Sequence, residues 1–477
     1  MPGKFKIIIS DLHLGGGFPQ INPLEDFTHD DVLSALLEEL AAESDRQGAD
    51  LELIVNGDAF EMLQVPHVDE YDPAQAYPSD LYHSSSEADS VRKMRLIVAG
   101  HRSLFDALGR FLRLGPPRRW VTFVKGNHDL NLYWPGVQNC LREALGATGR
   151  RSGLLVFEEL CVSREGIYVE HGNQYAELID RVDHMEKPLH PTRPGQLALP
   201  LGSWFVMDVL NPVERSRYWI DGVKPITALI WYALAFDFPF AAGALAMLLR
   251  ALPGIVEEAF LDAVPMEADL QAAGRGDSLS ERLEDPAQVE ALAAHYQQDA
   301  SFRAQFNGEV ANVLAPPPEQ AREPVAASLE VAPDLGDPVV MGNQVYVRAL
   351  SALSFSASRQ AAEKEAAVVV FGHTHHAVQE PLLGGATYIN TGTWTWRADF
   401  SGAGKSTWQD LFLHPERFTN DCQLTYARID YDEAGRPYGR LLVYGAEGSH
   451  VWVPVPVWAG RVWDRIRAWL CGWRPGS

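Results

Sequence analysis

Five short apolar runs, each followed at once by a polar motif, constrain the fold of this chain more than any other feature. The runs have the length and composition of buried strands: Phe5–Ser10, Leu51–Asn56, Trp120–Lys125, Ile167–Glu170 and Ala366–Phe371. The polar motifs are ISDLH at 9–13, NGDAFE at 56–61, KGNHD at 125–129, EHGN at 170–173 and FGHTH at 371–375. Helical patterns alternate with the first of these runs. We therefore predict an α/β fold whose polar side chains gather at the carboxyl ends of its strands.

Two helical patterns stand out between the early strands. Apolar residues recur on one helical face over Val32–Leu40, and Thr28 with Asp31 resembles a capping box at the start of that helix. A longer amphipathic pattern runs from Met94 to Leu112. Two further segments, Thr387–Thr391 and Gln423–Asp430, are predicted to be strands.

The strand–helix pattern breaks in the middle of the chain. Residues 226–249 are nearly all apolar, and residues 257–337 are acidic, Ala-rich and then Pro-rich, which is typical of surface helices and a linker. We therefore predict one α/β domain in two parts, 1–179 and 343–450. A helical insertion over 180–342 separates them. A basic, Trp-rich amphipathic tail follows over 451–477.

The overall charge narrows the classes of partner. Forty Lys and Arg stand against 63 Asp and Glu, a formal charge of −23 that disfavours long nucleic acids. The four cysteines form no CxxC pair, which fits a reducing compartment and argues against a thiolate zinc site. The first apolar run is short and delivers Asp11 and His13, so it predicts a strand rather than a signal peptide. The expected location is cytoplasmic.

The residue types in the five motifs predict a metal site. Carboxylate, imidazole and amide ligands suit divalent manganese, iron or zinc. Strand alternation would point Asp11 and His13 to the same side, so that both hold one ion. Asp58 could bridge two ions with its two oxygens. Two ions roughly 3.5–4 Å apart can clamp a phosphoryl group and supply a hydroxide nucleophile.

Together the motifs resemble the calcineurin-like metallophosphoesterase superfamily, whose pattern is D-x-H, G-D-x-x-[ED], G-N-H-[DE], a lone H and G-H-x-H. The resemblance covers roughly residues 5–175 and 366–430. It implies a four-layer α/β/β/α sandwich with a large helical insertion, and a site with two metal ions. One ion would be held by Asp11, His13, Asp58 and His375, and the other by Asp58, Asn127, His171 and His373.

The same resemblance implies roles for the residues beside the ligands. His128 would face the phosphate and protonate the leaving oxygen rather than bind metal. Asp129 would orient the ring of His128 and favour its protonated form. Glu61 would form hydrogen bonds to residues of the site without binding metal itself. Trp394 and Trp396, in the segment that follows the last motif, either pack in the core or form a wall for the leaving group.

Two segments suggest contact with a membrane. The apolar segment 226–249 contains Asp237 and Pro239 at its centre, which favours two short helices over one membrane span. This pair either packs on the α/β core or dips into one leaflet. In the tail, residues 459–477 put Trp and apolar residues on one helical face with four arginines nearby, a pattern of interfacial helices. Peripheral contact at the inner membrane face and burial against the protein both remain open.

The resulting hypothesis is a metal-dependent hydrolase of a phosphoester or pyrophosphate. Some members of the superfamily cleave a nucleotide–lipid pyrophosphate, and the apolar insertion suits such a lipid-linked substrate. Those members typically carry Arg where His128 stands, so a soluble phosphoester remains open as well. Two alternatives are a nucleotide phosphodiesterase or nuclease of the same superfamily, and a membrane-associated scaffold without activity.

Overall fold

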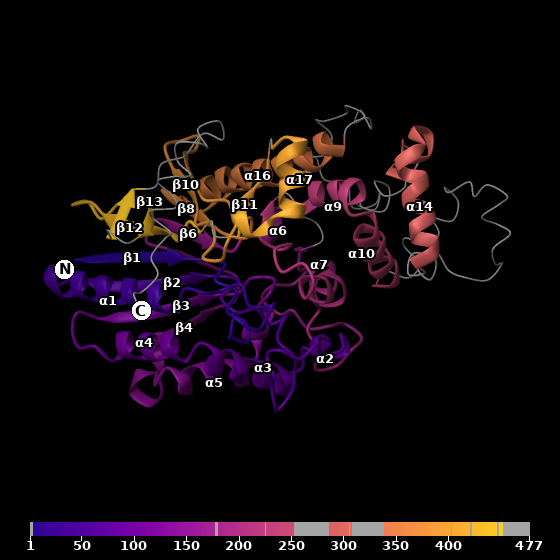
Figure 1. Cartoon of the computed structure of the whole chain (residues 1–477). Coiled ribbons are helices and arrows are strands. Elements are labelled where there is room, and N and C mark those ends of the chain that lie inside the picture. Colours follow the sequence, from indigo (N-terminus) through magenta and orange to yellow (C-terminus); the bar gives the residue numbers. More distant parts are fainter. Residues whose placement is uncertain are drawn as a thin grey trace, which may run out of the picture. The chain divides into compact units, whose positions relative to one another are not determined.

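A computed structural model describes residues 3–176, 180–224, 226–251, 286–304, 306–307, 338–401, 403–419, 422–445 and 448–451 (Figure 1). The chain divides into two compact units. The first comprises Met1–Ser203, Ala349–Arg397 and Thr419–Ser477, and the second comprises Trp204–Arg348 and Ala398–Phe418. The second unit therefore starts later than the predicted insertion and also takes in 398–418. Beyond Val451, the predicted tail lies outside the described residues, as does most of the predicted linker.

The first unit contains two large sheets. One has the strand order β14-β13-β12-β1-β2-β3-β4, and the other has the order β5-β6-β8-β10-β9. The strands of the seven-stranded sheet are β1 (Lys4–Ile9), β2 (Asp50–Asn56), β3 (Arg119–Val124), β4 (Leu155–Glu158), β12 (Thr425–Tyr431), β13 (Pro437–Gly445) and β14 (Gly448–Val451). Those of the five-stranded sheet are β5 (Cys161–Arg164), β6 (Ile167–Glu170), β8 (Val368–Phe371), β9 (Val378–Pro381) and β10 (Thr387–Asn390). All seven runs predicted as strands are strands.

Strand direction puts several carboxyl ends at one edge of each sheet. In the seven-stranded sheet β1, β2, β3 and β4 are mutually parallel, while β12, β13 and β14 continue the sheet in antiparallel fashion. In the five-stranded sheet β6, β8 and β10 are parallel, with β5 and β9 antiparallel at the two edges. The prediction of an α/β fold is confirmed.

Helices cover the outer faces of these sheets. The first unit contains α1 (Asp30–Gln47), α2 (Asp80–His83), α3 (Glu87–Gly100), α4 (Arg102–Arg113), α5 (Pro135–Ala144), α6 (Asn173–Ala176), the 3-10 helices η1 (Leu130–Tyr133) and η2 (Gly149–Leu154), and α16 (Pro338–Glu363) from Ala349 onward. The predicted single pattern from Met94 to Leu112 is two helices, because the chain turns at His101 between α3 and α4. The predicted capping box is also wrong: α1 begins at Asp30, after an N-cap at His29 that makes no side-chain bond.

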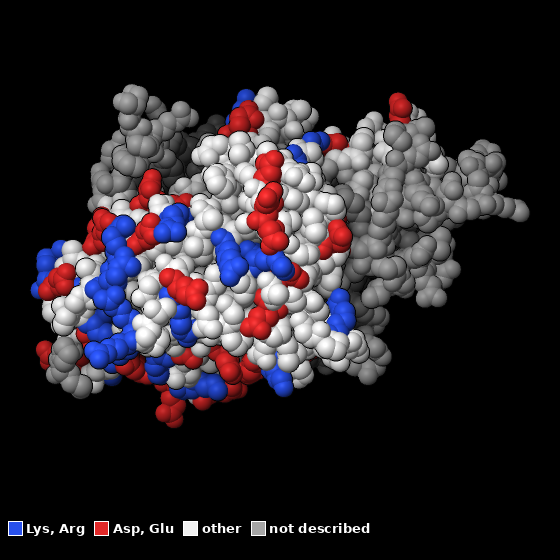
Figure 2. Space-filling view, turned by 90° about the horizontal axis from the view of Figure 1, so that it is seen from below, with Lys and Arg blue, Asp and Glu red and all other residues white. Residues whose placement is uncertain are grey.

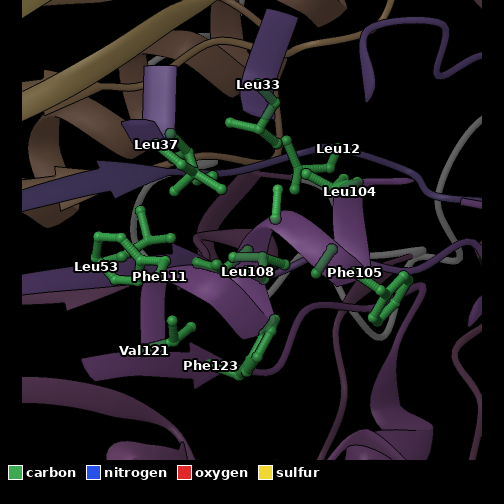
Figure 3. Packing of buried hydrophobic residues seen from close by; sticks show 14 of the residues in the cluster. Leu12, Leu33, Leu37, Leu53, Leu104, Phe105, Leu108, Phe111, Val121 and Phe123 are labelled. Carbon is green, nitrogen blue, oxygen red and sulfur yellow. The ribbon is translucent and has the colours of Figure 1, made fainter. Parts of the chain in front are cut away.

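The largest core cluster lies between the seven-stranded sheet and its helices. Figure 3 shows Leu33 and Leu37 of α1 and the apolar face of α4 gathered over strand residues such as Leu53 and Val121. Alternate residues along β1, β2 and β3 point into this cluster, which explains their near-continuous apolar sequence. Each fully buried Leu or Phe contributes about 1.5–3 kcal/mol relative to exposure.

The opposite faces of the same strands form a second core, between the two sheets. Ile8, Ile54 and Val124 of the seven-stranded sheet share this cluster with Val370 and Ile389 of the five-stranded sheet. A third cluster lies on the outer face of the five-stranded sheet, where Phe371, Tyr388 and neighbouring strand residues pack against Leu353 and Ala357 of α16. Helices therefore cover the outer face of each sheet, and the sheets pack on one another.

The second unit is mainly helical. It contains η4 (Val206–Leu210), α8 (Asn211–Glu214), α9 (Ile226–Phe236), α10 (Phe238–Ala251), α14 (Pro286–Gln298), α17 (Lys405–Leu413), η7 (Pro415–Arg417) and a two-stranded sheet of β7 (Val223–Lys224) and β11 (Ala398–Asp399), while α7 (Leu201–Phe205) crosses the boundary between the units. The predicted break in the apolar segment is confirmed, because α9 ends and α10 begins around Asp237. Its carboxylate lies 2.6 Å from Arg217 Nη2.

Apolar side chains of α9, α10 and α14 share one core cluster in this unit, with Phe412 of α17 packed against it. Among the described residues, no helix has both the length and the apolar character needed to cross a membrane. Contact with one leaflet and the cytoplasmic location stay predictions.

Charge is distributed unevenly over the first unit. Figure 2 shows Lys and Arg side chains gathered toward one end of the visible face, with Asp and Glu scattered over the rest. Exposed arginines of the first unit include Arg113 at the end of α4, Arg118 just before β3, and Arg150 and Arg151 in η2. These segments precede β3 and β4, so they belong to the edge opposite the carboxyl ends of those strands.

A buried ion-pair network links the two sheets at their amino-terminal side. Glu52 of β2 is fully buried, and its carboxylate lies 2.5 Å from Lys6 Nζ of β1 and 2.5 Å from Arg164 Nη2 of β5. Thr122 of β3 donates its hydroxyl to the same carboxylate at 2.6 Å. One carboxylate of β2 thus contacts three other strands, β1 and β3 in its own sheet and β5 in the other, and so links the two sheets.

We predict that Glu52→Ala lowers the free energy of unfolding by about 3–5 kcal/mol, because it leaves the buried Lys6 without this partner. Urea denaturation measures the change. The matched control is Asp106→Ala, which breaks the exposed pair with Arg102 and is expected to cost about 0–1 kcal/mol. Equal small losses for both variants would contradict a structural role for the buried pair.

Candidate functional site

The predicted site residues follow the carboxyl ends of five strands from both sheets. Asp11 and His13 follow β1, Asp58 follows β2, Asn127 follows β3, His171 follows β6, and His373 and His375 follow β8. Three overlapping groups have ligand atoms within 4.8 Å of one another: Asp11, His13 and His375; His13, Asp58 and His128; and Asp58, His171 and His373. The fold therefore brings residues up to 364 positions apart, 11 and 375, into one cluster.

The first group consists of two imidazoles and a carboxylate. His375 Nε2 lies 3.1 Å from His13 Nε2 and 3.5 Å from Asp11 Oδ1. Two ring nitrogens and a carboxylate oxygen therefore converge on one point, which is the donor set that a divalent transition-metal ion prefers.

The third group, Asp58, His171 and His373, repeats this donor set on the neighbouring strand ends. His171 Nε2 lies 3.0 Å from Asp58 Oδ2, and the ring centroids of His171 and His373 are 5.3 Å apart. The other nitrogen of His171, Nδ1, donates to the backbone oxygen of Asn56 at 3.0 Å. Because a carbonyl oxygen only accepts, Nδ1 carries a proton and Nε2 is the nitrogen available as a ligand.

Asn127 provides a direct test of whether these residues fit a cation. Its side chain is buried, and its Oδ1 has no hydrogen-bond donor among the described residues. A buried amide oxygen without a donor is uncommon, and a metal ion would satisfy it. The residue types, their convergence and this oxygen fit a metal centre.

The backbone at the ligand positions is strained. Asp11, His13, Asp58, His373 and His375 all have positive φ angles, between 48° and 70°. Residues other than glycine rarely adopt this left-handed conformation, and it costs about 1–3 kcal/mol where it is enforced. The prediction that strand alternation orients Asp11 and His13 is therefore wrong, because both residues lie beyond the end of β1 and are oriented by these turns.

Glycines beside the ligands leave the space that the ligands occupy. A Cβ atom on Gly126 would lie 2.1 Å from Asp58 Oδ1, and one on Gly372 would lie 2.5 Å from Asp11 Oδ2. A Cβ on Gly57 would meet the ring of His171 at 2.3 Å. The glycine of each GD, GN and GH pair is thus required by close packing of a strand end against a ligand from another strand.

Glu61 is the carboxylate that contacts His128. One oxygen, Oε2, lies 2.6 Å from His128 Nδ1 and 2.7 Å from His13 Nδ1. The ring of His128 also stands edge-on to that of His13, with centroids 4.8 Å apart. A single buried carboxylate therefore orients both imidazoles, and it leaves Nε2 of His128 as the nitrogen able to donate a proton.

The expected role of Asp129 as the partner of His128 is wrong in this structure. Its two oxygens accept backbone N–H groups, from Gly126 at 2.7 Å and from Ala59 at 2.8 Å. These bonds tie the turn after β3 to the turn after β2. Asp129 therefore shapes the backbone that carries Asn127 and Asp58, while Glu61 makes the contact with the His128 ring.

The charges of the cluster stabilise one another against burial. Burial alone would raise the pKa of Glu61, but the charge and hydrogen bond of His128 outweigh it and lower that pKa to about 2. Burial would lower the pKa of His128, yet Glu61 and then Asp58 raise it to about 10. Burial also acts to raise the pKa of Asp58, and the charge of His171, followed by that of His128, keeps it well below its usual range. The charges of the surrounding protein side chains thus favour an ionised Glu61 and a protonated His128 near neutral pH.

The segment after β10 supports Asp11 and was not predicted. The backbone oxygen of Asp11 accepts from Thr393 Oγ1 at 2.8 Å and from the backbone N–H of Trp394 at 3.2 Å. Ser10 Oγ donates to the Asp11 carboxylate and lies 2.5 Å from Thr391 Oγ1. Trp394 is fully buried and donates Nε1 to the oxygen of Thr425, so it packs in the core. No sequence motif marks the contacts of Thr391, Thr393 and Trp394 with Ser10 and Asp11, since they join residues more than 380 positions apart.

Asp180 is a second residue that sequence reasoning missed. Its Oδ2 lies 3.8 Å from His373 Nε2, and its charge contributes to the raised pKa of His128. Asn173, the last residue of the EHGN motif, donates Nδ2 to the Asp180 backbone oxygen at 2.9 Å. A lone Asp outside any strand-end motif gave no signal in the sequence.

Comparison with known proteins adds no assignment to this geometry. Neither a scan against models of protein families nor a search of curated proteins gives a match to the chain. The function is therefore inferred from the site itself.

We predict that Gly126→Ala lowers the free energy of unfolding by about 1–3 kcal/mol, because the added methyl group would overlap the Asp58 carboxylate and backbone. Thermal and urea unfolding measure the loss. Gly153→Ala is the matched control, since nothing lies within 4 Å of its added Cβ. A Gly126→Ala protein as stable as this control would contradict the close packing of the two turns.

Proposed function

We propose that this chain is a metal-dependent phosphoesterase that binds two divalent ions at the strand ends. The observation that carries the proposal is that two of the three groups, Asp11–His13–His375 and Asp58–His171–His373, adjoin without sharing a residue, and each has two histidines and one aspartate. The groups are coupled directly, because the backbone N–H of His373 donates to both oxygens of Asp11, at 3.0 and 3.1 Å. Paired sites of this kind suit phosphoryl transfer, in which charge develops on several oxygens at once.

The proposed ligands divide between two ions that share Asp58. Asp11, His13 and His375 would complete one site with Asp58, and Asn127, His171 and His373 would complete the other. The donors fit manganese, iron or zinc, as the sequence predicts, and do not separate these metals. When bound, the ions supply an activated water and offset the negative charge of the phosphoryl oxygens.

The proposed general acid is His128. Its Nδ1 is held by Glu61, and the neighbouring carboxylates favour the protonated ring. A protonated Nε2 can then donate to the oxygen of the leaving group as the bond to phosphorus breaks. We assign the orienting role to Glu61 and give Asp129 the role of supporting the turns that carry the ligands.

The fold supports the same proposal. Helices cover the outer faces of two sheets that pack on one another, which agrees with the four-layer α/β/β/α sandwich implied by the sequence resemblance. The proposed reaction is hydrolysis of a phosphoester or pyrophosphate bond. Arg113, Arg118, Arg150 and Arg151, which are exposed, belong to the amino-terminal edge and not to the strand ends that carry the proposed ligands.

We predict that Asp58→Ala abolishes hydrolysis of an aryl phosphodiester and lowers the metal content, because the variant removes the carboxylate shared by both proposed sites. Elemental analysis after dialysis measures bound metal, and release of nitrophenol measures turnover. A chelator should inactivate the wild type, and added manganese should restore it. Asp106→Ala, an exposed carboxylate on α4, is the control. Normal metal content and turnover in Asp58→Ala would reject the proposed site.

His128→Ala is expected to keep its metal and to lose about 10²–10⁴-fold in rate, because the general acid is lost while the proposed ligands remain. Glu61→Gln should lower the rate in the same direction, since it removes the charge that holds His128 protonated. Measuring kcat and bound metal together separates the two roles. Loss of metal from His128→Ala would instead make His128 a ligand.

A further inference from the structure

Two large apolar side chains are exposed on the loop that leaves the metal-ligand cluster. Phe18 is 50% exposed and Ile21 is 56% exposed, and both lie on the loop between β1 and α1, shortly after His13. They occupy the same tight turn, because the backbone N–H groups of Ile21 and Asn22 both donate to the oxygen of Phe18, at 3.0 and 2.9 Å. We call Phe18–Ile21 the apolar tip.

The base of this loop is anchored by hydrogen bonds. The carboxylate of Glu25 accepts the backbone N–H groups of Gly15, at 3.4 Å, and Gly17, at 2.5 Å. Asn22 donates Nδ2 to the oxygen of Gly17 at 3.1 Å and to the hydroxyl of Tyr71 at 3.0 Å. The exposure of the tip is therefore a property of a braced loop.

Close packing adds to these bonds. A Cβ on Gly16 would lie 2.5 Å from the Tyr71 hydroxyl, and a Cβ on Gly17 would lie 2.5 Å from the α-carbon of Gly100 at the end of α3. Glu25 is itself buried, 3.4 Å from the ring of His101. The three consecutive glycines thus allow the loop to lie close against its neighbours.

Phe18 has a φ angle of 62°, in the left-handed region. For a bulky aromatic residue this conformation is a genuine outlier, and glycine would adopt it at lower cost. Residues held in such strained conformations cluster at active sites and ligand-binding sites. Half of the surface of Phe18 remains open to solvent, so this residue is accessible to a ligand.

The tip lies within reach of a substrate held at the ligands. Phe18 is five residues beyond His13, which limits their separation to roughly 17 Å even in a fully extended chain. The chain between them is tied to the turn that carries Glu61, because the backbone N–H of Glu61 donates to the oxygen of Leu14 at 2.9 Å. The loop that carries the tip is therefore hydrogen-bonded to the turn that carries Glu61 of the site.

We propose that the apolar tip, Phe18 and Ile21, binds an apolar aryl or acyl group of the substrate, on the part of the molecule beyond the reacting phosphate. This inference rests on the proposed phosphoesterase function and narrows its substrate to phosphoesters that carry such a group. Contact with about half of each side chain accounts for roughly 5- to 30-fold in kcat/KM, equivalent to about 1–2 kcal/mol.

The test compares phosphodiesters that share a nitrophenyl leaving group and carry a methyl, an octyl or a hexadecyl chain. The wild type, with manganese added, is expected to prefer the longer chains. Phe18→Gly should lower kcat/KM for the hexadecyl ester by roughly 5- to 30-fold, mainly through KM, and leave the methyl ester unchanged. Glycine suits the left-handed conformation, so this variant is expected to unfold at the same or a higher temperature.

Ile21→Ser should act in the same direction, and Leu383→Ser is the matched control. Leu383 is 92% exposed between β9 and β10, far along the chain from the tip, and its loss should leave the preference for long chains intact. Equal losses on the methyl and hexadecyl esters, or no loss on either, would overturn the proposed contact. If the wild type hydrolyses none of the esters, the proposed phosphoesterase function itself fails, and this inference fails with it.

Sedimentation with vesicles of phosphatidylglycerol and phosphatidylcholine distinguishes the proposed substrate contact from a second explanation, in which the tip contacts a membrane. The proposal expects Phe18→Gly to leave vesicle binding as it is in the wild type. If the substitution abolished vesicle binding while the ratio of kcat/KM between the hexadecyl and methyl esters stayed constant, the tip would be a membrane contact, and the substrate assignment would be rejected.

Discussion

The arrangement of the site depends on the contacts that the Asp58 carboxylate makes with two other turns. One oxygen accepts the backbone N–H of His128 at 2.9 Å, and the other lies 3.0 Å from the Nε2 of His171. The backbone oxygen of Asp58 also accepts the N–H of His13 at 2.9 Å. A single residue thus connects the turns after β1, β2 and β3 in one sheet with the turn after β6 in the other. The two sheets must pack at one separation for these contacts to form together.

Apolar packing and buried charged groups both fix the distance between the two sheets. Branched apolar residues fill the space between the sheets, and they resist compression because protein interiors are close-packed. At the amino-terminal side, Glu52 joins β1, β2 and β3 to β5 through buried charges. The network around Asp58 does the same at the carboxyl side. Burying these charges is unfavourable unless each is paired, so removing one partner of a buried pair is expected to be destabilising.

The sequence predicted the strand ends well because that information is local. A run of apolar residues followed by Gly-Asp, Gly-Asn or Gly-His specifies both a buried strand and the tight turn after it. The partner of His128 was not predictable in this way, because Glu61 and Asp129 are both carboxylates near a motif and only the tertiary structure separates them. The helix break at His101 was missed for a related reason. Its ring bonds to Asp30 at 3.1 Å, a contact that the amphipathic pattern of 94–112 does not reveal.

Strain in the backbone connects the ligand cluster with the loop beside it. Of the described residues other than glycine with positive φ, five are proposed ligands, and Phe18 lies five residues past one of them. Such residues persist only where the surroundings fix them more strongly than the local preference opposes them. Around the ligands, the missing side chains of Gly126 and Gly372 and the bonds to Asp58 and Asp11 do this. The folding free energy of the two sheets therefore holds the proposed ligands in place, and this would lower the reorganisation that binding of the proposed metal ions requires.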